Sequence, residues 1–405
     1  MRDQKKLKVA YIHPYFGTTN GSWSSRPYDF ASRWVQQDAD ITVITAPYYK
    51  SDIKARGIIS EMFVNGFRVL VIDAADSNLF GFYRRTINAI KFALLSSFLV
   101  IWKRYDVVIT SSGPITVGLA GIIAKWLRNS RFVFEVRDLW PEGAIQMGLL
   151  RSRLKQRLAY WFEARCYRNS NLVVPLSTGM QEHIQRRFPN VKTCVVTNTS
   201  NGAFFNAEHS DIFNLPDSLI GKKLFIYFGS LGLMDACDDI IDAMMHLRHR
   251  HDLAVVFIGD GANRSELELR TAKEGLQANV LFLGLLPKSQ LRGWLKQSTA
   301  SLVMFKPYPV LSTVSPNKMF DSFAAGLPII QNTQGWIKEL VSATGCGITV
   351  INEDALSLAN AIEKMADDIA FRAASANAAY QLGRNTFDTN GRADLYYKTL
   401  IDITK

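Results

Sequence analysis

The sequence predicts an α/β protein with two domains, each built around a parallel β-sheet. Three observations support this prediction: the chain has 405 residues, short apolar runs alternate with longer helical stretches, and the alternation stops at a polar stretch before it starts again. One hydrophobic core rarely serves a chain of this length, and strands that alternate with helices form β-α-β units with parallel strands. We therefore expect two domains of roughly 200 residues each.

Six strands are predicted in the first half, each as a short run rich in Val, Ile, Leu and Phe. They are residues 8–13, 41–45, 67–72, 107–111, 132–136 and 172–176. Their alternation with helix-length segments indicates a Rossmann-like domain, which we assign to residues 1–205. Its end falls in the polar stretch NTSNGAFFNAEHSDIFNLPDS, residues 198–218.

The same pattern returns in the second half and predicts a second Rossmann-like domain over residues 206–385. Its strands are expected at residues 224–228, 254–258, 280–283, 301–304, 328–330 and 348–350. Residues 386–405 are predicted to form a C-terminal helix that could pack back toward the N-terminal domain.

The net charge of +11 is concentrated in the first half. Residues 1–205 hold 28 Lys and Arg against 14 Asp and Glu, whereas residues 206–405 hold 19 against 22. A basic half can serve an anionic lipid surface or a phosphorylated substrate, or can simply be solvated. Nucleic acid is not expected as a partner, because no DNA- or RNA-binding motif accompanies the charge.

Compartment is predicted from the cysteines and the first residues. Four cysteines lie far apart without the spacing of a zinc site or a disulfide framework. The basic N-terminus leads straight into a predicted strand, so we expect no signal peptide. A cytoplasmic location follows, with peripheral attachment to the inner membrane as an option.

That option depends on residues 84–104. Residues 92–102 are apolar apart from two serines, and basic residues flank them: Arg84, Arg85, Lys103 and Arg104. Eleven helical residues span about 16 Å, less than a bilayer crossing needs, so this segment is not expected to be transmembrane. Two readings remain open, a helix lying in the membrane interface and a buried crossover helix.

Polar residues follow two strands of the first half, where parallel sheets bind ligands. The loop after residues 8–13 offers Gly17, Gly21 and Ser22 as a cradle for phosphate or sugar, although such residues also occur for turn geometry. The loop after residues 132–136 reads Arg137-Asp138-Leu139-Trp140-Pro141-Glu142. Two interpretations are open for the ionisable groups of this loop: they hold a substrate, or Arg137 and Asp138 form a structural ion pair.

Two glycine-bearing turns follow the first two strands of the second half. Gly229 and Ser230 belong to the first turn, and Gly259 and Gly261 to the second. Backbone amides in such turns bind phosphate, but neither turn is a complete dinucleotide-binding fingerprint.

The most specific segment comprises Ser315, Pro316, Asn317, Lys318 and Asp321. A helix that begins after the proline directs its amides and the lysine toward a diphosphate, while the aspartate one turn later can accept hydrogen bonds from ribose hydroxyls. This combination predicts a nucleotide-sugar site. The alternative is a surface ion pair between the lysine and the aspartate at i and i+3.

The chain resembles the retaining GT-B glycosyltransferases of family four over nearly its whole length. Three segments carry the resemblance: 321–328, DSFAAGLP, 280–287, VLFLGLLP, and 138–142, DLWPE. The last is similar to the WbuB-like branch, which assembles O-antigen and capsule sugars. The resemblance implies two domains that face each other across a cleft, with an acceptor-binding first half, a donor-binding second half, and Leu285 near the base of the donor.

Three features differ from the family pattern. Thr313 stands where the first of two family acids is expected, and no basic residue occurs from Gly229 to Asp239. Lys318 therefore becomes the main candidate cation for the diphosphate. The usual cleft histidine is missing after residue 136, while His13 ends the first strand.

The activity implied is transfer of a hexosyl group, with retention, from a UDP- or dTDP-type sugar to a lipid-linked or soluble glycan acceptor. Lys318 is expected to stabilise the leaving diphosphate, and Arg137, Asp138 and Glu142 to act on the acceptor side, with no metal or other cofactor. Two rival interpretations are a UDP-sugar epimerase and a non-catalytic protein that binds sugar nucleotides.

Overall fold

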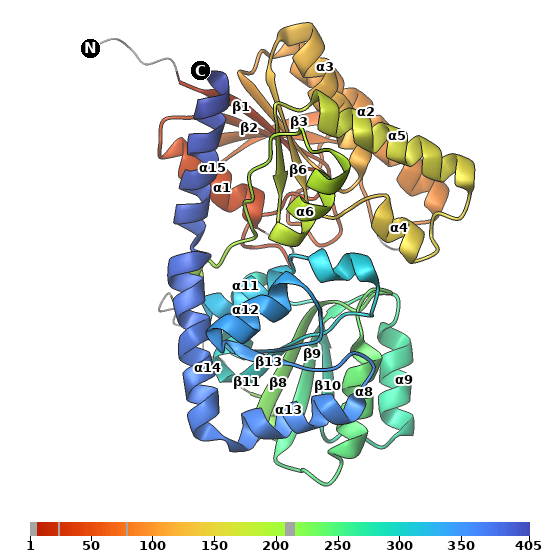
Figure 1. Ribbon diagram of the computed structural model, residues 1–405, viewed down its shortest axis with the longest axis vertical. Helices are drawn as coiled ribbons and strands as arrows, with labels where there is room; N and C mark the ends of the chain where they lie inside the picture. The colour runs from red at the N-terminus through yellow and green to blue at the C-terminus, as the bar shows by residue number, and fades with distance from the viewer. Residues whose placement is uncertain (1–5, 23–24, 78–79, 207–214) are drawn as a thin grey trace. The chain divides into compact units, whose positions relative to one another are not determined.

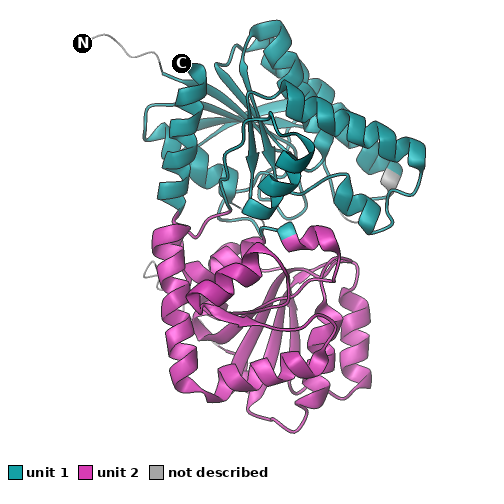
Figure 2. Ribbon diagram, in the orientation of Figure 1, with its two compact units in different colours: residues 1–197, 313–315, 389–405 teal, residues 198–312, 316–388 magenta. Residues whose placement is uncertain are grey.

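The computed structural model describes residues 6–22, 25–77, 80–206 and 215–405. The chain forms two compact units (Figure 2). The first comprises residues 1–197, 313–315 and 389–405, and the second residues 198–312 and 316–388. The predicted linker, residues 198–218, therefore belongs to the second unit, and its residues 207–214 lie outside the described part.

The described part of the first unit contains a seven-stranded sheet in the order β3-β4-β2-β1-β5-β6-β7. Its strands are β1 (Lys8–Ile12), β2 (Asp40–Thr45), β3 (Ile59–Val64), β4 (Phe67–Ile72), β5 (Val107–Ser111), β6 (Arg131–Val136) and β7 (Leu172–Pro175). All six predicted strands are present and pair in parallel. Strand β3 was not predicted; it is an antiparallel edge strand joined to β4 through Asn65 and Gly66. Most of its side chains are exposed, so it lacks the apolar run of a buried strand.

Helices cover both faces of this sheet (Figure 1). They are α1 (Arg26–Val35), α2 (Phe82–Trp102), α3 (Gly118–Arg128), α4 (Glu142–Gln146), α5 (Arg153–Asn169), α6 (Thr178–Arg187) and α15 (Thr389–Thr404). Alternate residues of β1 enter different cores: Val9 and Tyr11 pack with α1 and α15, whereas Ala10 and Ile12 pack with α2 and α3. The indole nitrogen of Trp34 donates to the Ala393 carbonyl at 2.9 Å, which joins α1 to α15 within this unit.

Helix α2 corrects one expectation. It has 21 residues rather than eleven, about 31 Å, because its polar first turns also belong to the helix. Among the described helices it alone is long and apolar enough, by length and composition, to cross a membrane. Yet a third of its most apolar stretch is buried, and Phe92, Leu99 and Val100 pack in the core against the sheet. One face of α2 is thus the buried face of a crossover helix.

The described part of the second unit contains a six-stranded parallel sheet in the order β10-β9-β8-β11-β12-β13. Its strands are β8 (Lys223–Ser230), β9 (Leu253–Asp260), β10 (Val280–Gly284), β11 (Ser298–Val303), β12 (Ile329–Gln331) and β13 (Gly347–Thr349). Its helices are α7 (Gly202–Asn206), α8 (Cys237–His246), α9 (Arg264–Lys273), α10 (Lys288–Gln297), α11 (Asn317–Ala324), α12 (Trp336–Thr344), α13 (Ala355–Asp367) and α14 (Ile369–Gln381). All six predicted strands are found, and the prediction of two Rossmann-like domains is confirmed.

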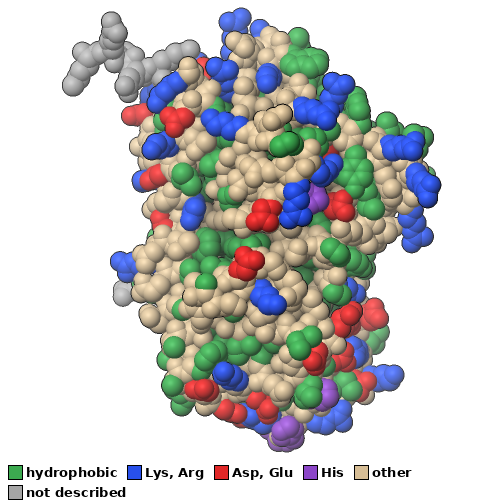
Figure 3. Space-filling model, viewed as in Figure 1, with side chains coloured by type: hydrophobic (Ala, Val, Ile, Leu, Met, Phe, Trp, Pro, Cys, Tyr) green, Lys and Arg blue, Asp and Glu red, His purple; other side chains and the backbone are tan. Residues whose placement is uncertain are grey.

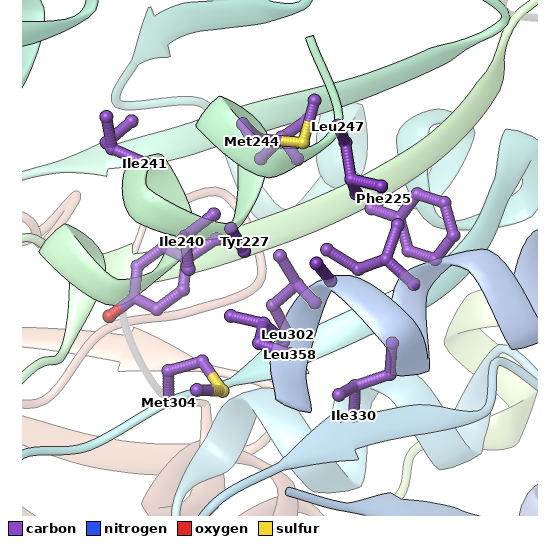
Figure 4. Close-up of a cluster of buried hydrophobic side chains, with 14 of the residues drawn as sticks. Phe225, Tyr227, Ile240, Ile241, Met244, Leu247, Leu302, Met304, Ile330 and Leu358 are labelled. Atoms are coloured by element: carbon purple, nitrogen blue, oxygen red, sulfur yellow. The ribbon is translucent and has the colours of Figure 1, made fainter. Parts of the chain in front are cut away.

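The core of the second unit shows why its strands have these sequences. Phe225 and Tyr227 of β8 point toward Ile240 and Met244 of α8 and toward Leu358 of α13 (Figure 4). Each fully buried apolar side chain of this size stabilises the fold by about 1.5–3 kcal/mol. This packing fixes the carboxyl end of β8, from which the candidate site is built.

Candidate active site

The side chain of Lys318 lies at the point in the second sheet where the order of the strands reverses. From β8 the chain adds β9 and β10 on one side of the sheet, and then β11, β12 and β13 on the other side. Strands β8 and β11 therefore flank the topological switch point, the position at which open α/β sheets bind ligands. The Lys318 ammonium lies 4.0 Å from the ring centroid of Tyr227 on β8 and 4.9 Å from that of Phe305, which follows β11. The lysine selected from the sequence thus lies beside the switch point of the second sheet.

Lys318 has a counter-ion within its own domain. Its Nζ lies 3.2 Å from Oδ1 of Asp235 and 2.7 Å from the hydroxyl of Tyr227, to which it donates. The Lys318 and Asp235 side chains are only 8% and 7% exposed. The Tyr227 hydroxyl donates to Asp235 at 2.6 Å, and burial, followed by the nearby Asp235 carboxylate, raises the pKa of Tyr227 well above its usual value. The lysine is thus buried beside a counter-ion, and any anionic ligand would compete with Asp235 for it.

Asp321, one turn further along α11, pairs with Lys288 rather than with Lys318. The Lys288 Nζ lies 2.9 Å from Asp321 Oδ1, and both side chains are nearly buried. Burial raises the pKa of the Asp321 carboxyl, and Lys288 partly offsets that rise. The alternative of a surface pair between residues 318 and 321 is therefore wrong, because each has another buried partner.

The four glycine-turn residues lie at the ends of β8 and β9. Gly229 and Gly259 are cross-strand partners with φ of 128° and 150°. A Cβ on Gly259 would stand 1.8 Å from the Gly229 carbonyl oxygen, so close strand approach alone requires glycine here. The next pair is Ser230 with Asp260, and a Cβ on Gly261 would stand 2.4 Å from the Leu231 carbonyl oxygen.

Four further predicted residues lie in different parts of the fold. Leu285 follows β10 and is 36% exposed, so its side chain is open to a ligand. Ser315 belongs to the first unit together with Thr313, whereas Pro316 caps α11 and Asn317 is its first residue. The carbonyl of Thr313 accepts from Ser177 Oγ at 2.6 Å, so the residue at the family's acid position is held by its backbone.

In the first unit, the predicted acceptor residues lie after β6. The Arg137 backbone N–H donates to Ser112 Oγ at 2.9 Å, while its Nη1 is buried without a hydrogen-bond partner in the described residues. Asp138 is exposed. The described part of the chain contains no ion pair between these two residues, so the structural alternative of an Arg137–Asp138 pair is not supported. Glu142 accepts from the Tyr160 hydroxyl at 2.6 Å and from Gln146 at 2.9 Å; the hydroxyl bond is the main cause of its lowered pKa.

The loop with Gly17, Gly21 and Ser22 is hydrogen-bonded to residues 50–52, which precede β3. Asp52 accepts from the backbone N–H of Thr18 at 2.9 Å, and the Ser22 N–H donates to the Lys50 carbonyl at 2.9 Å. These bonds satisfy part of the backbone that was predicted to cradle phosphate. A phosphate role for this loop stays a prediction.

Sequence reasoning missed a buried cluster at the same edge of the first sheet. Glu135 accepts hydrogen bonds from Tyr11 at 2.9 Å and Ser111 at 2.7 Å, and it pairs with Arg26 at 3.0 Å. Nearby, His13 is buried, and the pKa of its imidazole is lowered by burial and then by the charges of Arg137 and Arg26. A charged residue within an apolar strand, as in RFVFEV, was the available signal for the Glu135 cluster.

Comparison with known proteins agrees with this architecture. Residues 28–199 match the family described as Glycosyl transferase 4-like domain, and residues 213–382 match Glycosyl transferases group 1. WbjE of Pseudomonas aeruginosa, named a probable glycosyltransferase, is 24% identical over 65% of this chain and 67% of its own length. WcaI of Escherichia coli (strain K12), whose name assigns it provisionally to colanic acid biosynthesis as a glycosyl transferase, is 26% identical over 51% of each chain. The chain thus aligns with about half to two thirds of these relatives.

A solved structure extends the likeness to the whole fold. Anabaena HepE in complex with UDP-glucose superposes with a TM-score of 0.70 at 16% identity, covering 98% of this chain and 100% of HepE. At this identity the likeness concerns the fold alone.

Proposed function

Because this chain is a glycosyltransferase of the GT-B fold, with a 4-like domain in its first half and a group 1 domain in its second, we propose that it transfers a hexosyl group from a UDP- or dTDP-type sugar to a hydroxyl of a glycan acceptor. The UDP-glucose complex of HepE supports this donor class. The name of WcaI, which refers to colanic acid biosynthesis, supports a role in polysaccharide assembly. Within this role we propose the bacterial surface polysaccharides O-antigen, lipopolysaccharide or capsule. Residues 138–142 support the WbuB-like branch.

The single observation that carries the proposal is the Lys318 ammonium at the switch point between β8 and β11. The donor diphosphate binds at the start of α11, where the first backbone amides of a helix attract anions. Its oxygens take Lys318 from Asp235, which holds the ammonium in position beforehand. Asp321 accepts from the ribose hydroxyls, and Lys288 favours its ionised form.

In this proposal the anomeric configuration is retained, because the acceptor attacks the face of the sugar from which the leaving group departs. The bond between the anomeric carbon and the diphosphate oxygen breaks, the acceptor oxygen bonds to that carbon, and the acceptor proton passes to the departing diphosphate. Charge accumulates on the diphosphate, so preorganised donors near Lys318 lower the barrier without a protein nucleophile.

The acceptor binds the first domain in this proposal. The exposed Asp138 is available to orient a hydroxyl, and the buried unpartnered Nη1 of Arg137 suits an anionic group of the acceptor. Glu142 already accepts from two side chains, so it shapes the loop. A lipid-linked acceptor and a peripheral position at the cytoplasmic face of the inner membrane suit the basic first half.

The test combines binding with product analysis. UDP, dTDP and their sugars are screened for thermal stabilisation, and the best donor is incubated with a panel of soluble and polyprenyl-linked acceptors. Acceptor-dependent diphosphate release with a product of unchanged anomeric configuration by NMR is expected. Release of free epimer without acceptor would favour the epimerase, and donor binding without turnover over the whole panel would favour a non-catalytic binding protein.

A further inference from the structure

Helix α2 carries an apolar stripe on the side opposite its buried face. The stripe consists of Tyr83, Ile87, Ile90, Leu94, Phe98 and Trp102. Successive members are three or four residues apart, so they follow one side of the helix for its entire length. Their exposure ranges from 49% to 83%, although the opposite side is packed in the core. A crossover helix with one buried face would normally present polar residues to water.

Helices α3 and α5 extend this surface. The end of α3 exposes Trp126 and Leu127, and α5 exposes Leu154, Leu158 and Trp161 at i, i+4 and i+7. The three helices are neighbours: α3 contacts both α2 and α5. We call the surface formed by these eleven side chains of α2, α3 and α5 the three-helix face.

Hydrogen bonds join the C-terminal ends of the three helices. Arg128 of α3 donates to the Ile101 carbonyl of α2, and the indole nitrogen of Trp126 donates to Asn169 of α5 at 3.1 Å. The exposed tryptophans of three different helices therefore belong to one rigid layer on one side of the first sheet. Tryptophan is the residue type that favours the boundary between lipid and water.

The three helices contribute mainly basic side chains to the three-helix face, although Arg85 and Lys91 of α2 pair with Asp76 and Asp73 at 3.0 and 3.6 Å. Neither α2 nor α3 contains an acidic residue, and the one acid of α5, Glu163, is buried and paired with Arg187. The start of α5 instead exposes Arg153, Lys155 and Arg157. Figure 3 shows such basic side chains interleaved with apolar ones over α5, at the right-hand edge of the first unit. Cations in the first turn of a helix are unfavourable, because the N-terminal end of the helix dipole is positive. An anionic partner would offset this repulsion.

We propose that the three-helix face docks on an anionic lipid bilayer, with α2 and α5 lying in the headgroup region and Trp102, Trp126 and Trp161 entering the lipid boundary. The proposal deepens the proposed function, because it gives the surface that would bring the enzyme to a lipid-linked acceptor. Apolar burial and attraction of the basic rim act together on such a surface.

Two other arrangements fit the observations less well. Helix α2 is long enough to cross a bilayer, but insertion would remove Phe92, Leu99 and Val100 from the core against the sheet. A second copy of the chain would bring two basic faces together, and like charges across an interface disfavour association.

The test uses the full chain and vesicles of phosphatidylcholine with or without phosphatidylglycerol. Wild-type protein is expected to float with the anionic vesicles at low salt and to dissociate as salt is raised. Leu158→Glu/Trp161→Glu on α5 and Phe98→Glu/Trp102→Glu on α2 should each weaken binding about tenfold or more. Leu269→Glu/Ile369→Glu, at positions 73% and 70% exposed in the second unit, is the matched control and should bind as wild type.

A second readout locates the face directly. Brominated lipids should quench the tryptophan fluorescence of the wild type but not that of Trp102→Phe/Trp126→Phe/Trp161→Phe, which keeps its apolar surface. Binding by the α5 variant equal to wild type, or undiminished quenching in the triple variant, would overturn the proposal. So would absence of wild-type flotation, including the case in which the protein dimerises through this face. UDP-induced thermal stabilisation is measured in every variant and should be unchanged, so loss of docking is distinguishable from failure of the proposed transferase.

Discussion

Replacing Asp235 with asparagine tests the buried pair that holds Lys318. At the observed 3.2 Å and an effective dielectric constant near 20, the two charges attract by about 5 kcal/mol. Desolvation offsets much of this attraction, but removal of one partner leaves the other charge buried and uncompensated, at a cost of about 3–5 kcal/mol. Because both side chains are over 90% buried, solvent does not screen this cost away.

The assay is thermal unfolding with and without UDP. A loss of this size lowers the melting temperature by roughly 6–20 °C in a unit of about 190 residues. Glu268→Gln, which breaks the exposed i,i+4 pair with Arg264, is the control and should cost at most about 0.5 kcal/mol. The proposed exchange also predicts that UDP stabilises Asp235→Asn more than it stabilises the wild type, because the diphosphate no longer competes for Lys318.

Two results would refute this reasoning. If Asp235→Asn unfolds within about 1 kcal/mol of the wild type, the ammonium is not an uncompensated buried charge in the variant. If Lys318→Met keeps the wild-type stabilisation by UDP, the lysine does not bind the diphosphate, whatever the stability of Asp235→Asn.

Three further outcomes are expected. Lys288→Met should destabilise the protein most at pH 7–8 and less toward pH 5, as measured by unfolding at several pH values. Loss of the cation raises the pKa of buried Asp321 further, and a raised carboxyl pKa costs stability only once the group ionises. A constant difference in stability across pH would contradict this. Gly259→Ala should lower the free energy of unfolding in urea by about 3 kcal/mol or more. The control is Gly275→Ala, also at positive φ but with no atom within 4 Å of the added Cβ, which should lose only about 1–2 kcal/mol. Equal losses would mean that backbone conformation rather than the close approach of the strands matters. Ser177→Ala should cost about 1 kcal/mol, measured in the same way, because this side chain caps α6, and no loss would show the cap to be dispensable.

Much of the fold is local information and could be predicted from the sequence. A strand buried on both faces needs an apolar run and a helix needs its own period, so twelve parallel strands were predicted close to their observed bounds. Strand β3 was missed because an exposed edge strand need not be apolar. The length of α2 was underestimated because its first turns are exposed and polar, and a surface helix needs no apolar residues there.

The candidate site divides in the same way. Lys318 and Asp321 could be selected from sequence, since a helix start after proline is a local signal. Their partners could not: Asp235 lies 83 residues from Lys318, and Lys288 reaches Asp321 from another helix. Sequence alone determined which side chains carry charge, but only the tertiary structure decided which charges meet. The fold brings distant strand ends together, and a buried charge is stable only beside the partner it finds there.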